Sequence, residues 1–302
     1  MAELEHGEYE ASHPILSGLR LAVALSAVIL VVESVGAYLS HSLSLTVDAV
    51  HNVPDILAFT VSWTALAGTR RGSTAEFTFG KHRLEVFAGI LNGGLVLGTG
   101  AAFGFAALLS LLTRNPFAGP VDALWLLVTA LPTLALRAVN LRVLGRIPGR
   151  VRDLNLASVM THLASDIAIT GALLIAGVTL LLVPSVGWVD AIGALAIAAI
   201  LVVESLPLLG EGWEVLGERT PRGISVARIT ESALAVPGVS GMHDVHVWSV
   251  CSTLVCMTAH VDVREMSLRE SMGVVKSLRE TMEKEFGIVH ATFEIEGPGA
   301  PA

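Results

Sequence analysis

The sequence predicts a bundle of six transmembrane α-helices followed by a small cytoplasmic α+β domain. The 302 residues are 53% hydrophobic and 15% charged, whereas a soluble protein carries about 25% charged residues. Uncharged runs of membrane-spanning length recur up to about position 210, and short alternating apolar runs among charged residues follow. We therefore expect an N-terminal cytoplasmic tail (1–14), a membrane domain (15–210) and a cytoplasmic α+β domain (211–302).

Six runs predict the transmembrane helices. A helix rises 1.5 Å per residue, so about 20 residues cross a bilayer core of about 30 Å. The runs that reach this length cover residues 15–39, 43–67, 86–112, 121–141, 156–183 and 189–209. The third is the clearest, because its only distinctly polar side chains are Asn92, Thr99 and Ser110.

The basic residues predict the orientation of these helices. One side of the membrane receives only Arg114; the other receives Arg70, Arg71, Lys81, Arg83, Arg137, Arg142, Arg146, Arg150 and Arg152. By the positive-inside rule the basic side is cytoplasmic, which places both termini in the cytoplasm. The N-terminus has no basic region typical of a cleaved signal peptide. Because no organelle-targeting sequence is visible, we expect the cell membrane as the location.

The C-terminal region predicts a small ferredoxin-like α+β domain with its elements in the order α-β-β-α-β. Its helices are expected at 225–236 and 267–286, and its strands at 245–250, 254–263 and 288–296. In the last strand Val289, Ala291, Phe293 and Ile295 share one face, as the two-residue period of a strand requires, so the helices can cover that face.

Charge and cysteine content exclude two classes of protein. The chain has 19 Lys and Arg against 27 Asp and Glu, a formal net charge of −8, which is unlike a basic nucleic-acid binder. It has two cysteines, Cys251 and Cys256, which is too few for a disulfide-stapled secreted module. We interpret both as ordinary small residues.

Ionisable residues are concentrated in two of the predicted transmembrane helices. The second contains Asp48, His51 and Asp55, and the fifth contains His162 and Asp166. Spacings of three and four place each set on one helix face. Because an ionisable group in the membrane costs at least about 2.5 kcal/mol, each of these groups is expected to have a function or a partner.

Two matching His-x-x-x-Asp pairs predict a metal site if the two helix faces meet. Two imidazoles and two carboxylates suit tetrahedral Zn²⁺, whereas Mg²⁺ and Ca²⁺ prefer six or more oxygens. Co²⁺, Cd²⁺, Ni²⁺ and Fe²⁺ also fit this ligand set. The alternative is hydrogen bonding between helices. For Asp48 a relay beside the site and a bond to a neighbouring helix both stay open; Glu33, Asp190 and Glu204 are read mainly as interfacial or interhelical contacts.

Several motifs resemble the cation diffusion facilitator family. They are SHSLSLTVDAVHNVPD (40–55), FGKHRLEVFAGILN (79–92), THLASD (161–166), HDVHVWSV (243–250) and HATFEIE (290–296). The resemblance implies a six-helix transporter that works as a homodimer and exports a divalent metal from the cytoplasm in exchange for protons. It implies a metal site of the zinc-selective type at His51, Asp55, His162 and Asp166.

The resemblance also implies a metallochaperone-like cytoplasmic domain that dimerises and binds regulatory metal. Its ligand positions correspond to His243, His260, His290 and Glu296. The strand pattern supports part of this, because His290 and Glu296 share one strand face.

Protons and metal compete for the same imidazole and carboxylate lone pairs, so a pH difference can drive exchange. We therefore expect proton-coupled efflux of Zn²⁺ and no enzyme activity. The alternatives are transport of another divalent cation, an intramembrane metalloenzyme, a haem-binding electron carrier and a metal sensor that moves no ions.

Overall fold

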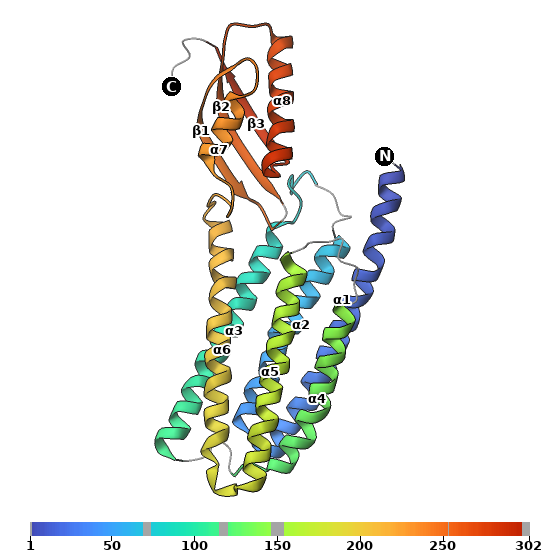
Figure 1. The fold of residues 1–302 in the computed structure, drawn as a ribbon, viewed down its shortest axis with the longest axis vertical. Coiled ribbons are helices and arrows are strands. Elements are labelled where there is room, and N and C mark those ends of the chain that lie inside the picture. Colours follow the sequence, from blue (N-terminus) through green and yellow to red (C-terminus); the bar gives the residue numbers. More distant parts are fainter. Residues whose placement is uncertain (1, 69–73, 115–119, 146–153, 253, 298–302) are drawn as a thin grey trace. The chain divides into compact units, whose positions relative to one another are not determined.

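The structure is a computed structural model that describes residues 2–68, 74–114, 120–145, 154–252 and 254–297 (Figure 1). Within these ranges the side chains of residues 2–19, 22, 55, 58, 59, 61–68, 144 and 154–162 lie outside the description. The chain divides into two compact units. The first comprises Met1–Gly72 and Ala88–Leu209, and the second comprises Ser73–Phe87 and Gly210–Ala302.

Six long helices account for the predicted hydrophobic runs. They are α1 (Ala2–Ser40), α2 (Leu43–Gly68), α3 (Arg83–Thr113), α4 (Ala123–Leu144), α5 (Leu154–Leu182) and α6 (Trp188–Leu216). Among the described residues, all of them except α2 contain a stretch long and apolar enough to cross a membrane. Part of α2 lies outside the described side chains, so the sixth span stays a prediction.

Two of these helices are longer than expected. α1 begins at Ala2 instead of position 15, and α6 continues to Leu216 instead of ending at 209. Charged residues ended the predicted spans, but charge limits only the part of a helix that can lie in lipid and does not break the helix. α6 also continues past Pro207, as membrane helices often do.

In the first unit α1 packs against α2 and α4, and α4 packs against α5. Small residues permit close approach: a side chain at Gly36 of α1 would collide with Thr129 of α4, and one at Gly100 of α3 would lie 2.9 Å from the carbonyl oxygen of Ala198 in α6. Small residues at helix crossings are typical of membrane bundles.

The start of α2 is held by a carboxylate from another helix. Asp190 of α6 is buried and accepts hydrogen bonds from the hydroxyls of Ser42 and Ser44 and from the main-chain amides of Leu43 and Ser44. The first amides of a helix have no partner within it, so Asp190 acts as an N-cap supplied from α6. The expected interhelical contact of Asp190 is confirmed.

The second unit contains the small α+β domain. Its elements are α7 (Val226–Leu234), β1 (Val239–Ser249), β2 (Val255–Val263), α8 (Leu268–Phe286) and β3 (His290–Glu296). The strand order is β1-β2-β3; β1 and β2 are antiparallel, and β2 and β3 are parallel with α8 as their connection. The predicted α-β-β-α-β order is confirmed.

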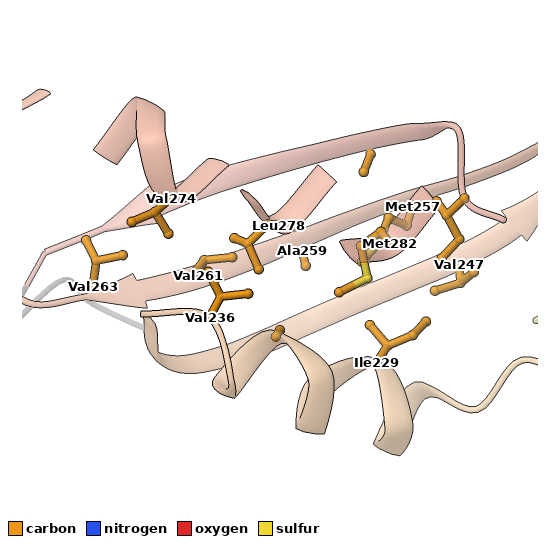
Figure 2. Packing of buried hydrophobic residues seen from close by; sticks show 13 residues of the cluster. Ile229, Val236, Val247, Met257, Ala259, Val261, Val263, Val274, Leu278 and Met282 are labelled. Atoms are coloured by element: carbon orange, nitrogen blue, oxygen red, sulfur yellow. The ribbon is translucent and has the colours of Figure 1, made fainter. Parts of the chain in front are cut away.

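The core of this domain lies between the sheet and its two helices (Figure 2). α8 contributes Val274, Leu278 and Met282 at intervals of four, while α7 contributes Ile229 and Ala233. Alternate residues of β2 face them: Met257, Ala259, Val261 and Val263. The opposite face of β2 carries polar residues, as the strand period requires.

The chemistry of the helix ends explains where α8 begins and ends. The hydroxyl of Ser267 accepts a hydrogen bond from the amide of Glu270, and the Glu270 carboxylate accepts one from the amide of Ser267. This is a capping box. Gly287 follows the helix with φ +68°, a left-handed conformation that glycine adopts without strain.

The first strand starts earlier than its sequence pattern indicated, at Val239 instead of 245. The register shifts between His243 and His246, and Asp244 has φ +48°. This irregularity is a β-bulge, which breaks the alternation of apolar and polar residues on which the prediction depended.

Candidate metal sites

The polar faces of α2 and α5 meet inside the first unit. His51 of α2 and Asp166 of α5 are buried, and His51 Nε2 lies 3.8 Å from Asp166 Oδ1. Ligand atoms about 2.0–2.1 Å from a tetrahedral Zn²⁺ are about 3.3 Å apart. The pair is therefore close to the spacing that a shared metal ion requires.

The other two predicted ligands lie in the same helices. Asp55 is one turn after His51 in α2, and His162 is one turn before Asp166 in α5. Their side chains lie outside the described set, so the structure brings together His51 and Asp166 and leaves the contribution of Asp55 and His162 as a prediction.

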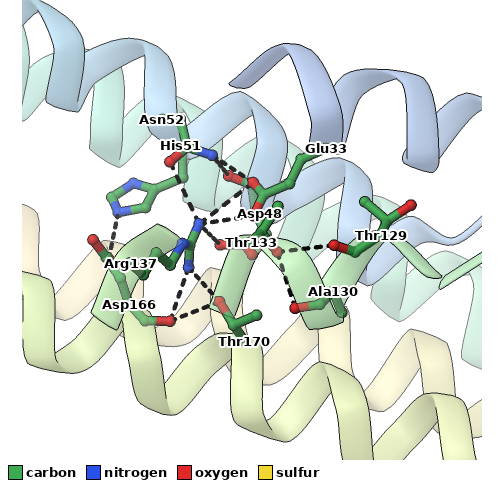
Figure 3. A network of polar contacts seen from close by, with 10 residues as sticks. All are labelled: Glu33, Asp48, His51, Asn52, Thr129, Ala130, Thr133, Arg137, Asp166 and Thr170. Carbon is green, nitrogen blue, oxygen red and sulfur yellow. Dashed lines mark hydrogen bonds and ion pairs between the residues drawn. The ribbon is translucent and has the colours of Figure 1, made fainter. Parts of the chain in front are cut away.

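A buried arginine stands beside this pair (Figure 3). Arg137 of α4 is 2% exposed; its Nη2 lies 3.0 Å from Asp48 Oδ1 and 3.2 Å from Glu33 Oε1. Its Nη1 donates to the main-chain oxygen of Asp166 at 2.8 Å and to Thr170 Oγ1 at 2.7 Å. One guanidinium thus links helices α1, α2, α4 and α5.

This arrangement corrects the interpretation of Arg137 as one of the basic residues around the connection between the fourth and fifth helices. The sequence did contain evidence for this role. Arg137 lies within the predicted span 121–141, and an ionisable residue inside a transmembrane span needs a partner. Glu33 makes the interhelical contact expected of it. Asp48 pairs with Arg137, which supports the bond to a neighbouring helix over a relay role.

A second group of possible ligands lies in the α+β domain. One ligand atom each from His243, His260 and Glu296 lies within 4.8 Å of the others. The register of the sheet explains this, because His243 is paired with His260 across β1 and β2, and Asp262, two residues on, is paired with Glu296 of β3.

Carboxylates surround the imidazoles of this group. His260 Nδ1 lies 2.6 Å from Glu296 Oε1, and His243 Nε2 lies 3.5 Å from Glu296 Oε2. The hydrogen bond to Glu296, together with nearby Glu294 and Asp244, raises the pKa of His260 above its usual value. The carboxylates therefore attract cations, and His260 binds its proton more tightly than a free imidazole in water does.

His290, the fourth predicted position in this domain, is not part of the group. It begins β3, and Glu296 ends it, so about 20 Å separates them at about 3.3 Å per residue. The ring of His290 instead meets the edge of Phe79 at a centroid distance of 5.6 Å. Sharing a strand face did not place the two residues close together.

The two cysteines are free and buried. Burial raises the pKa of the Cys256 thiol, which favours the uncharged form and suits a small packed residue. The Sγ of Cys251 lies 3.7 Å from Nδ1 of His82.

The first unit is a bundle of long apolar helices with buried imidazole and carboxylate groups. The second unit contains a small domain in which histidine and carboxylate side chains lie close together. These features define a membrane protein that interacts with cations. The sequence profile of the cation efflux transmembrane domain matches residues 19–216, and that of the cation efflux protein cytoplasmic domain matches residues 221–297. The chain belongs to the cation efflux family. It is a divalent-metal efflux transporter of the membrane and not an enzyme.

Three proteins are similar to this chain over most of its length. The metal cation efflux system protein CzcD of Cupriavidus metallidurans is 28% identical over 92% of this chain and 85% of its own. The cadmium, cobalt and zinc/H⁺-K⁺ antiporter of Bacillus subtilis is 24% identical over 88% of this chain and 84% of its own. The mouse proton-coupled zinc antiporter SLC30A2 is 23% identical over 92% of this chain and 77% of its own.

One solved structure matches part of this chain. The metal-bound C-terminal domain of the CzcD transporter of Cupriavidus metallidurans is 30% identical, covering 24% of this chain and 99% of that one, with a TM-score of 0.22.

Proposed function

We propose that the chain exports Zn²⁺ from the cytoplasm in exchange for protons, through a site formed by His51, Asp55, His162 and Asp166. The observation that carries this proposal is the approach of His51 and Asp166 inside the membrane unit, 3.8 Å apart and both buried. Zinc and protons appear in the names of the Bacillus subtilis and mouse relatives.

Helix direction supports the two ligands whose side chains are not described. Two further helices separate α2 from α5 in a chain that crosses back and forth, so α2 and α5 run in opposite directions. The residue one turn after His51 then has the same depth as the residue one turn before Asp166. These are Asp55 and His162, and together the four residues supply two nitrogens and two oxygens.

This ligand set favours Zn²⁺, because a closed tetrahedral site of imidazole and carboxylate suits its coordination. Cd²⁺, Co²⁺, Ni²⁺ and Fe²⁺ are the alternative cargoes, since such a site discriminates weakly among them. The name of the Bacillus subtilis relative includes cadmium and cobalt.

Proton exchange follows from competition for the ligands. Metal needs neutral imidazoles and ionised carboxylates, so a site open to a more acidic compartment gains protons and loses metal. The helix bundle must open the site to one side at a time, because a site open to both sides would let metal and protons leak.

The positive-inside rule supports cytoplasmic termini even without Arg137, and we propose the cell membrane as the location. Arg70, Arg71, Lys81 and Arg83 remain in one loop, and Arg142 remains near the end of α4.

We further propose that His243, His260 and Glu296 bind a regulatory metal ion in the cytoplasm, without His290, and that the chain works as a homodimer. The support is the clustering of the three ligand atoms and the match of residues 221–297 to the family's cytoplasmic domain.

The experiment is zinc uptake into proteoliposomes that contain a trapped zinc indicator, under an imposed pH gradient. Native protein is expected to take up zinc with the gradient. His51→Ala, Asp55→Ala, His162→Ala and Asp166→Ala are each expected to abolish uptake while the protein stays folded. Asp122→Asn is the matched control, because it removes a carboxylate but keeps a good N-cap for α4.

Two results would contradict the proposal. Uptake that survives Asp55→Ala and His162→Ala would remove these residues from the site. A native protein that binds zinc but moves neither zinc, cobalt, cadmium nor iron would favour a sensor.

A further inference from the structure

The two helices that carry the proposed ligands contribute to one apolar cluster of the membrane unit. Val47 of α2 and Ile169 and Leu173 of α5 belong to it, together with residues of the other helices. Apolar packing has no preferred direction, so it does not by itself fix the distance between His51 Nε2 and Asp166 Oδ1. A polar group that contacts both helices at this depth can fix that distance.

Arg137 of α4 reaches both helices with different nitrogens. Nη1 donates to the carbonyl oxygen of Asp166 and to Thr170 Oγ1, which itself donates to the same carbonyl at 2.9 Å. This arm holds the main chain of α5 at the ligand residue itself.

The other arm holds α2. Nη2 lies 3.0 Å from Asp48 Oδ1 and 3.4 Å from Asn52 Oδ1, and these residues lie one turn before His51 and directly after it. Figure 3 shows the guanidinium between these residues and Asp166. The planar fork thus spans the gap between the ligand-bearing faces of α2 and α5.

Glu33 of α1 completes the network. Its carboxylate lies 3.2 Å from Arg137 Nη2 and accepts a hydrogen bond of 2.6 Å from Asn52 Nδ2. Arginine stays charged in a protein, so a buried guanidinium needs compensating charge. Glu33 and Asp48 supply it, and this engagement keeps both carboxylates on Arg137 instead of on the cargo.

We propose that Arg137 is a positioning residue that sets the spacing of α2 and α5 at the metal site. The proposal rests on the proposed function, because it assumes that His51 and Asp166 bind the transported ion. A lysine keeps the charge, but its single nitrogen cannot make parallel contacts in two directions as the guanidinium fork does. Charge alone is therefore insufficient, and the two-armed geometry is required.

The test measures metal geometry and affinity in the full chain, in nanodiscs. His260→Ala is the common background, so that the cytoplasmic cluster does not contribute. Co²⁺ reports tetrahedral coordination through its visible ligand-field bands, Zn²⁺ competition against Co²⁺ reports affinity, and thermal unfolding reports stability. Asp166→Ala identifies the signal that belongs to the membrane site.

Arg137→Lys is expected to stay folded, to change the Co²⁺ bands and to weaken Zn²⁺ binding by roughly 10- to 100-fold, the usual loss when a group that orients a metal ligand is removed. Arg142→Gln is the matched control, because it removes an exposed arginine from the last turn of the same helix. It is expected to behave as the background does.

Unchanged Co²⁺ bands and unchanged Zn²⁺ affinity in Arg137→Lys would overturn the proposal. This holds even if the melting temperature falls, because a lower melting temperature alone indicates a purely structural role. If Arg137→Lys does not fold, Thr170→Val decides: it removes one acceptor of Nη1, and weaker Zn²⁺ binding supports the proposal while unchanged binding overturns it. If the background itself shows no Co²⁺ signal that Asp166→Ala removes, the proposed function fails first.

Discussion

The two units place the same ligand chemistry in opposite surroundings. In the membrane unit His51 and Asp166 are buried, and a buried arginine with two further carboxylates stands beside them. In the α+β domain the apolar residues fill the core, and His243, His260 and Glu296 lie partly exposed on the opposite face of the sheet. In a buried site, other side chains must compensate the charges and fix the positions of the helices. In a partly exposed site, the protonation of the ligands, and with it the metal affinity, follows the pH of the solvent.

The strongest test of this contrast is removal of the buried positive charge. Arg137→Met leaves Glu33 and Asp48 buried without their cation and is expected to cost about 3–5 kcal/mol of stability. Thermal unfolding in nanodiscs measures it. Combining Arg137→Met with Glu33→Gln and Asp48→Asn is expected to recover much of the lost stability. An Arg137→Met protein as stable as the native protein would contradict the contrast.

The second test concerns the apolar core of the α+β domain. Leu278→Ala leaves a cavity between α8 and the sheet and is expected to cost about 3 kcal/mol. Hydrogen exchange should accelerate in β2 and α8 and stay unchanged in α2 and α5, because the two units have separate cores. Faster exchange throughout both units would show that they unfold together.

The third test returns to the membrane unit and its interhelical cap. Asp190→Ala leaves buried hydroxyls and amides at the start of α2 without their acceptor, and is expected to cost about 2 kcal/mol. Asp190→Asn keeps one acceptor oxygen and should lose less. Thermal unfolding of both variants checks the order; equal stability of the native and alanine proteins would exclude the cap.

The fourth test uses the exposure of the cytoplasmic cluster to protons. The pKa of His260 is raised by its hydrogen bond to Glu296, so the proton remains until a higher pH than on a free imidazole. Zinc needs the neutral ring, so below that pKa its affinity should fall about tenfold per pH unit, or about 1.4 kcal/mol. Zinc titrations of the Asp166→Ala protein measure this; an affinity independent of pH below 7 would exclude His260 as a ligand.

The raised pKa of His260 has the opposite effect on the folding stability of the metal-free domain: zinc affinity rises with pH, whereas this stability falls. Protonated His260 paired with Glu296 adds stability at low pH, and this contribution is lost as the pH rises through the raised pKa. Glu296→Gln should remove this dependence in metal-free unfolding experiments.

The smallest expected effect is at the start of α8. Ser267→Ala removes the hydroxyl that accepts from the Glu270 amide and is expected to cost about 1 kcal/mol, while Ser267→Asp should be nearly neutral. Thermal unfolding of the α+β domain within the full chain measures both variants. A neutral alanine variant would show that the capping box adds little here.

The sequence alone predicted the features that depend on local spacing. Hydrophobic runs of membrane length identified the long helices, the two-residue period identified the strands, and intervals of three and four placed Asp48, His51 and Asp55 on one face of α2. Each of these follows from the geometry of a single helix or strand, so residues far away in the chain do not change it.

Contacts between distant segments needed the tertiary structure. Arg137 looked like one of several basic residues until α1, α2 and α5 surrounded it, and His290 and Glu296 shared a strand face although about 20 Å separates them. Which side chains meet is decided by how separate elements pack. The sequence by itself therefore determined the order and type of the elements and the two His-Asp pairs. Only the tertiary structure showed the true ends of α1, α6 and β1 and the arginine that joins the ligand-bearing helices.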